Sequence, residues 1–344
     1  MRAFIGLVAG LTISLLLTAL VGENPILVLQ VIVRSAVGSF DDLALTLFYS
    51  TSLIFTGLAV AMAFRAGLFN IGAEGQLSIS ALALAALAPQ VAGWSPLLFL
   101  PLALITTVCA GFLWGLIPGW IRAYRGGHEV VVTMMLNFVA AGIVNYFVVG
   151  TLRDPESQSP ETLPLPENLL LRAYDPLQKS LPDSPLNSTF LLALLCCFGL
   201  WFMLRSSRFG FHLRALSGNP VAAATQGIDI RKLQLWAMAL SGAFASGVAL
   251  NEILGNSGKL KLGFSADFGF VGIAVALLAR NHPMAIIPSA ILFGILTKGT
   301  GDLDIETESI TRDFTRIMQA VIILSISVAS FIDWPRFRNS EVKK

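Results

Sequence analysis

Three polar side chains stand close together in an otherwise apolar stretch, Arg65-Ala-Gly-Leu-Phe-Asn-Ile-Gly-Ala-Glu-Gly-Gln, which supplies Asn70, Glu74 and Gln76. An ionisable group among apolar residues is costly to bury, so it is usually paired, hydrated or functional. Two interpretations stay open. Asn70 could cap a helix whose positive N-terminal end attracts Glu74, or these groups could line a path for a polar solute.

Other apolar runs also carry isolated polar groups. Asn137 and Asn145 are eight residues apart, which places them near one face of a helix. They either line a polar pathway or hydrogen-bond to a neighbouring helix. Asn251, Glu252 and Asn256 close a further apolar run and are expected to form a polar cluster with Asp267, which is either the entrance to a pathway or an ordinary hydrated loop.

One segment has the pattern of a short helix with small side chains. Ser217 or Asn219 can cap it, Pro220 suits its first turn, and Gly227 ends it. Such a helix fits as a knob in the groove of a partner protein, whereas a simple connector is the alternative. The whole segment comprises Ser217, Gly218, Asn219, Pro220, Val221, Ala222, Ala223, Ala224, Thr225, Gln226, Gly227 and Ile228.

Several kinds of chemistry lack their residues in this sequence. It has no Gly-x-x-x-x-Gly-Lys-Ser/Thr phosphate-binding loop, so we expect no nucleotide hydrolysis by this chain. Its three histidines are far apart, which makes a metal site improbable, and no nucleophile–base pair stands out. We therefore predict a chain that is not an enzyme, with no catalytic residues, metal or cofactor of its own.

Composition indicates that lipid surrounds most of these residues. Of the 344 residues 55% are hydrophobic and only 13% are charged, and the mean hydropathy is +0.74. A soluble domain is about 25% charged. The net charge of +2 gives no field that would recruit nucleic acid.

The hydrophobic runs predict an all-α polytopic membrane protein. Residues 24–40 form an amphipathic segment that is expected to lie along the membrane surface, and the N-terminal run is expected to be retained as a first helix. The ten expected spans are Ala3–Val21, Leu43–Phe64, Asn70–Pro89, Pro96–Ile121, Glu129–Gly150, Asn187–Leu204, Leu233–Asn251, Phe268–Arg280, Pro283–Thr300 and Arg316–Ile332.

The Lys/Arg bias of the loops predicts that both termini are cytoplasmic. The same topology makes residues 151–186 an outer loop, either an ordered docking surface or a flexible linker, and residues 205–232 the longest cytoplasmic loop. The segments opening at Asn70 and Asp267 would run in opposite directions. We therefore expect one permease domain over residues 1–344, in which spans two to five and seven to ten form inverted repeats.

Three blocks resemble the bacterial ABC-importer permeases that serve simple sugars, branched-chain amino acids and nucleosides. They are Ala63–Gln76; His128-Glu-Val-Val-Val-Thr-Met-Met-Leu-Asn-Phe, which is similar to the nucleoside branch; and Gly272-Ile-Ala-Val-Ala-Leu-Leu-Ala-Arg-Asn-His-Pro. The resemblance runs from about Asn24 to Ile332. It implies a multi-pass protein of the bacterial cytoplasmic (inner) membrane that imports a small solute by alternating access.

The same resemblance implies partners and roles. Residues Ser217–Ile228 would be the coupling helix seated in a separate ATPase subunit, which binds the ATP, and the region Phe69–Gln76 would lie near the translocation pathway. A substrate-binding lipoprotein would deliver the solute outside, and a second permease subunit would complete a heterodimer. The expected cargo is a small neutral polar solute, a nucleoside in the first place.

Other functions stay open at this point. The same class of permease could carry riboflavin or a simple sugar. A secondary transporter would need ion-coupling groups within its spans, for which the sequence offers Glu74 and Glu129. An intramembrane enzyme would need a converging catalytic set, which is not visible.

Overall fold

The computed structural model describes residues 2–91, 93–181, 184–307 and 310–331. These ranges are almost entirely helical, and their extended pairing is limited to two isolated bridges, Arg153–Thr162 and Glu161–Lys261. The basic C-terminal residues that favour a cytoplasmic C-terminus lie outside the described residues; they are Arg336, Arg338, Lys343 and Lys344.

Six helical segments of the described chain are long and apolar enough to cross a membrane. They are α3 (Phe40–Arg65), α5 (Pro96–Arg125), α6 (Glu129–Val149), α8 (Thr189–Ser206), α14 (Pro283–Gly301) and the continuous run formed by α11 (Ile230–Ala245), α12 (Gly247–Ala249) and the π-helix η4 (Leu250–Ser257).

The other elements are shorter or frame the bundle. They are α1 (Arg2–Leu20), α2 (Pro25–Val37), α4 (Ala73–Ala85), η1 (Ala88–Gln90), η2 (Glu167–Leu169), η3 (Leu171–Ala173), α7 (Pro176–Ser180), α9 (Arg208–Gly218), α10 (Pro220–Thr225), α13 (Phe268–Leu278), α15 (Leu303–Glu306) and α16 (Arg312–Phe331).

Two of the ten expected spans are short helices. The expected span Asn70–Pro89 is represented by α4, which begins only at Ala73 and has 13 residues, and Phe268–Arg280 by α13, which has 11. At 1.5 Å per residue these helices are about 20 Å and about 17 Å long, less than the hydrocarbon thickness of about 30 Å. The membrane-spanning helical architecture is confirmed, and the number ten stays a prediction.

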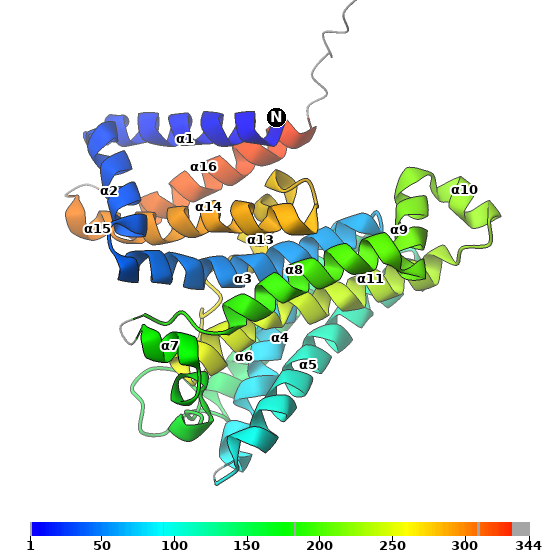
Figure 1. The fold of residues 1–344 in the computed structure, drawn as a ribbon, viewed down its shortest axis with the longest axis horizontal. Coiled ribbons are helices and arrows are strands. Elements are labelled where there is room, and N and C mark those ends of the chain that lie inside the picture. The colour runs from blue at the N-terminus through cyan, green and yellow to red at the C-terminus, as the bar shows by residue number, and fades with distance from the viewer. Residues whose placement is uncertain (1, 92, 182–183, 308–309, 332–344) are drawn as a thin grey trace, which may run out of the picture.

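The core forms around α3. Of the 18 residues that form the apolar stretch of this helix, 78% are buried, against 17% of the corresponding stretch of α6, so α3 is central and α6 is peripheral. Ser39 caps the first turn of α3 through Asp42, and Arg65 ends the helix. Figure 1 shows α3, α8 and α14 running along one another, with α1 and α16 paired on one side and α5 and α6 on the other.

Glycines allow α5 and α11 to approach closely. A Cβ atom added to Gly242 of α11 would lie 2.0 Å from the carbonyl oxygen of Gly111 on α5, and one on Gly115 would lie 2.5 Å from the carbonyl oxygen of Met238. Close backbone contact through small residues is a common way to pack helices inside a membrane. These two helices therefore fix the position of the long run that ends in the π-helix.

The two long loops lie at opposite ends of α8. The loop 151–186, with α7, precedes this helix, and α9 and α10 follow it. Figure 1 shows α10 projecting beyond the bundle, far from α7. The helix α2, capped by Asn24, crosses between the ends of α1 and α3 in the same view, and its position along the membrane surface stays a prediction.

Candidate functional site

Asn70 lies in the turn before α4 and links that helix to α11 and, through Ser241, to α3. Its Nδ2 donates to Oε1 of Gln76 at 3.1 Å and to Oγ of Ser241 on α11 at 2.8 Å, while its Oδ1 accepts from the N–H of Gly72 at 2.8 Å. Ser241 in turn donates to the carbonyl of Ala59 on α3. The N-cap residue of α4 is Gly72, so Asn70 holds the turn before the helix and does not cap it.

Asn137 bonds across helices. Its Oδ1 accepts from the N–H of Gly75 at 2.8 Å and its Nδ2 donates to the carbonyl of Ile71 at 3.0 Å, so one amide of α6 fixes the first turn of α4. Asn145, on the same helix, is exposed. The structure thus separates two residues that their spacing had grouped together.

Glu74 joins the beginnings of the two short helices. Its carboxylate accepts from the hydroxyl of Ser265 and, at 2.8 Å, from the N–H of Gly269 in the first turn of α13. The helices touch here, because a Cβ on Gly269 would lie 2.5 Å from the N atom of Glu74. Asp267 precedes α13 in a left-handed conformation (φ 61°) and is exposed.

A second buried network surrounds Asn251 in the π-helix. Its Oδ1 accepts from Thr189 Oγ1 at 2.7 Å and from Asn187 Nδ2 at 3.2 Å, and its Nδ2 donates to Ser52 Oγ at 2.9 Å. Ser52 donates to Oε1 of Glu252 at 2.8 Å. A π-helical stretch inside a longer helix is frequent at functional sites, and here it aims two adjacent polar residues at α3.

Among the described residues, Asn251 and Asp267 are not hydrogen-bonded to each other, although the sequence placed them in one cluster. Asn251 is fully buried, whereas Asp267 is exposed beside the α4–α13 contact. The partners that the sequence did not indicate are hydroxyl groups and one amide: Ser52, Asn187, Thr189, Ser241 and Ser265. Their only signal is a polar residue within or close to the end of an apolar helix.

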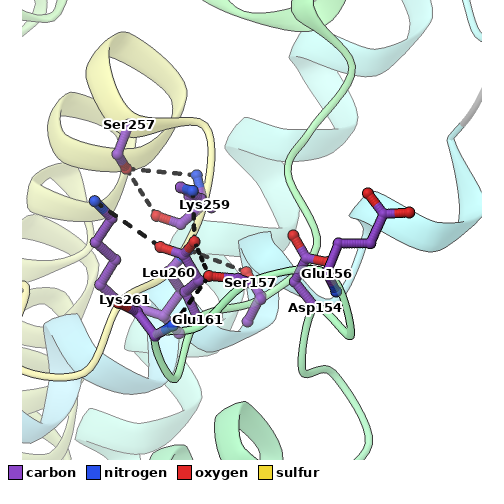
Figure 2. A network of polar contacts seen from close by, with 10 residues as sticks. Asp154, Glu156, Ser157, Glu161, Ser257, Lys259, Leu260 and Lys261 are labelled. Atoms are coloured by element: carbon purple, nitrogen blue, oxygen red, sulfur yellow. Dashed lines mark hydrogen bonds and ion pairs between the residues drawn. The ribbon is translucent and has the colours of Figure 1, made fainter.

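The loop 151–186 is fastened to the segment that follows the π-helix, as Figure 2 shows. Glu161 is 5% exposed and accepts from Lys259 Nζ at 2.6 Å and from Ser157 Oγ at 2.6 Å, with Lys261 Nζ at 3.9 Å. The hydrogen bond from Lys259, followed by that from Ser157, lowers the pKa of Glu161 below its ordinary value.

Backbone bonds reinforce this connection. The N–H of Thr162 donates to the carbonyl of Leu260 at 3.0 Å, and the N–H of Leu165 donates to the carbonyl of Gly258 at 2.8 Å. Glu156 points away from the lysines in Figure 2. Residues 157–165 of this loop are therefore attached to the segment that follows the π-helix, and the docking role of the loop stays a prediction.

The short helix with small side chains is α10. Asn219 caps it, since its Oδ1 accepts from the N–H groups of Val221 and Ala222 at 3.0 and 3.1 Å. Ser217 and Gly218 instead belong to the end of α9. Within α10 only Ala223 is buried, so the helix presents nearly all of its surface outward.

Comparison with known proteins identifies the class of molecule. The family model described as "Branched-chain amino acid transport system / permease component" matches residues 43–327. The guanosine ABC transporter permease protein NupP of Bacillus subtilis is 37% identical over 86% of this chain and 82% of its own. NupQ of the same organism, named likewise, is 27% identical over 72% of this chain and 78% of its own.

A sugar permease is also similar. The glucose ABC transporter permease protein TsgB13 of Haloferax volcanii is 29% identical over 81% of this chain and 74% of its own. No solved structure matches the chain. With a family model that covers most of the sequence and six apolar helices long enough to span a membrane, this chain belongs to the branched-chain amino acid transport permease family, as a non-catalytic, multi-pass membrane subunit of an ABC transporter.

Proposed function

We propose that this permease imports a nucleoside across the cytoplasmic membrane. The observation that carries the proposal is the pair of carboxylates inside the bundle. Glu74 and Glu252 each accept a hydrogen bond from a serine hydroxyl, Ser265 and Ser52, and the described residues offer neither of them an ion pair. Ribose hydroxyls and the N–H groups of a base are donors of the same kind.

The similar proteins support the same cargo class. Two of them are named guanosine permeases, and the more similar is 37% identical to this chain. One is named for glucose, another neutral solute rich in hydroxyl groups. A simple sugar is therefore the second candidate, and riboflavin, which carries a ribityl chain, is the third.

The proposed pathway runs between the two polar networks. Asn70, Glu74, Gln76 and Asn137 lie at the start of α4, and Asn251 lies in the π-helix, with the hydroxyl of Ser52 between α3 and that helix. Asp267 and Asn145 belong to it only as exposed flanking residues. Short helices that begin at a binding site are typical of transporters built from inverted repeats, so we retain ten segments and the repeats in the proposal.

Energy would enter through α10. The family implies an ATPase subunit and a substrate-binding protein as partners. We propose that the ATPase binds the ATP and receives the segment Ser217–Ile228, that a lipoprotein docks on the loop 151–186, and that a second permease completes a heterodimer. The similarity to both NupP and NupQ, two permeases of one organism, supports that pairing.

Reconstituted transport tests this proposal. The chain, its ATPase, a second permease and the binding protein are placed in proteoliposomes, and uptake of labelled guanosine is measured with unlabelled guanosine, glucose or riboflavin as the competitor. We expect ATP-dependent uptake that guanosine alone suppresses. Uptake that continues without ATP or ATPase would show a secondary transporter. Suppression by glucose alone, or by riboflavin alone, would make that solute the cargo in place of a nucleoside.

A charge introduced in α10 tests the coupling role. The side chain of Ala222 is exposed, so Ala222→Asp should leave the permease folded and reduce both ATPase binding and uptake. Ser95→Asp adds the same charge at the exposed N-cap position of α5, outside both proposed docking segments, and serves as the matched control. Normal transport by the Ala222→Asp protein would show that α10 is only a connector.

A further inference from the structure

A cavity of about 350 Å³ opens where α3, α8, α9 and α14 come together, and its lining is strongly basic. Arg65, Arg205 and Arg214 face it, together with Trp201 and His282. Arginine stays protonated at any physiological pH. Three guanidinium groups therefore share one small space near the end of the bundle that carries α9 and α10.

Nothing in the described part of the chain neutralises these three charges. The ion pairs found there involve other residues. Arg65 Nε and Nη2 donate to the carbonyl of Asn281 at 3.2 and 2.8 Å, which uses two of its five N–H donors. The guanidinium of Arg205 lies over the ring of Trp201, 5.7 Å from the centroid. Most of the donor capacity thus remains for a ligand.

The face of α8 that leads to the cavity is apolar. Leu191, Leu195, Phe198 and Phe202 are spaced along one side of this helix and are 58, 63, 51 and 57% exposed. The ring centroids of Phe198 and Trp201 are 5.6 Å apart, so this apolar stripe of α8 ends at Trp201, the ring over which the guanidinium of Arg205 lies. Tryptophan is typical of the level of lipid headgroups, which places the cavity at that depth.

We propose that this cavity binds a phosphate-bearing anion, and that the occupant is an anionic phospholipid whose acyl chains lie along the stripe of α8. Guanidinium groups bind phosphate oxygens through paired, charge-assisted hydrogen bonds. Basic pockets between helices on the cytoplasmic side of membrane proteins bind such headgroups. A free phosphate would use the same arginines but would leave the apolar stripe without a role.

Native mass spectrometry of the intact transporter tests this site. The protein is equilibrated with equal amounts of phosphatidylethanolamine, phosphatidylglycerol and cardiolipin, and the retained lipids are counted. The test variant is Arg205→Gln/Arg214→Gln, which leaves the Arg65–Asn281 bonds intact. We expect a selective loss of the two anionic lipids, about tenfold for each charge-assisted contact, with unchanged thermal stability in phosphatidylethanolamine.

The matched control is Arg125→Gln/Arg231→Gln. It removes the same charge from two exposed arginines, of which Arg125 also lies over a tryptophan ring, that of Trp120, 5.3 Å from the centroid. Equal lipid loss in both variants would overturn the site in favour of general charge attraction. Retention of inorganic phosphate by the cavity without any preference for anionic lipid would overturn the lipid assignment. Anionic lipid that is retained only when the ATPase is absent would overturn it too, because the cavity would then be a contact surface for that subunit.

Discussion

Replacing Glu74 by alanine should separate α4 from α13. In the structure one carboxylate accepts two hydrogen bonds from the other side of this contact, from Ser265 Oγ and from the N–H of Gly269. Alanine accepts neither. The N–H of Gly269 then has no partner in a position where its own residue is buried.

The cost follows from what is left unpaired. A buried N–H without an acceptor costs about 1–3 kcal/mol, and the hydroxyl of Ser265, which is half-buried and able to rotate, adds about 1 kcal/mol. Relief of the desolvation of the carboxylate offsets part of this loss. We expect a net destabilisation of about 2–3 kcal/mol, which lowers the Tm by about 3–4 °C for a chain of this size.

Glu74→Gln tells packing from substrate contact. A glutamine amide can accept from Gly269 and donate to the Ser265 oxygen, so its destabilisation should stay below about 1 kcal/mol. Thermal scans at one fixed rate measure stability, and uptake in proteoliposomes measures function. Ser78→Ala is the matched control on α4, because Ser78 donates only to the carbonyl of Glu74 within its own helix.

Two outcomes would refute the reasoning. If Glu74→Gln lowers the Tm as much as Glu74→Ala, hydrogen-bond pairing does not hold the two helices together. If Glu74→Ala and Ser265→Ala add without any coupling in a double-mutant cycle, the bond between their side chains contributes nothing. Loss of uptake by Glu74→Gln at unchanged stability would support the proposed place of the carboxylate on the solute pathway.

Three further outcomes follow from the same structure. Gly242→Ala should abolish the α5–α11 packing, because its Cβ would lie 2.0 Å from a carbonyl oxygen, whereas Gly142→Ala on α6 meets no atom within 4 Å; detergent size-exclusion profiles distinguish them. Asn137→Ala should cost about 1–3 kcal/mol, because it leaves the N–H of Gly75 in α4 and the carbonyl of half-buried Ile71 before α4 unpaired, while exposed Asn145→Ala should leave the Tm unchanged. Glu161 has a lowered pKa in the folded protein, so its contribution to stability is full above its ordinary pKa and is lost as the pH falls through the lowered value. Pepsin cleavage of residues 151–165 should accelerate in that acidic range, and in Glu161→Gln this pH dependence should disappear.

Hydropathy predicts the long helices of this protein well and the short ones poorly. A lipid environment demands about 20 apolar residues per span, and α3, α5, α6, α8 and α14 begin or end within a few residues of the expected positions. The start of α4 is different. Asn70 appeared to begin that helix, but its Oδ1 holds the N–H of Gly72, so the chain stays non-helical until Ala73.

The partners of the buried polar residues could not be predicted from their types. Hydroxyl groups in membrane helices usually donate to a carbonyl of the preceding turn, and Ser50 and Thr51 do so in α3. Their neighbour Ser52 donates instead to Glu252, 200 positions away. Only the packing of the π-helix against α3 decides which of these adjacent hydroxyls turns outward.

The contact between α4 and α13 bears on the proposed inverted repeat. Glu74 is the second residue of α4 and Gly269 is the second residue of α13, so the bond between them joins equivalent positions of two helices that the proposal makes equivalent. Elements that lie on a two-fold axis meet through equivalent residues. Two helices that start at one point and run apart would each cross only part of the membrane. The lengths of α4 and α13, about 20 Å and about 17 Å, together suffice for the hydrocarbon thickness of about 30 Å. Their shortness is then what a pair of half-helices requires, and the carboxylate of Glu74 stands at the point where both begin.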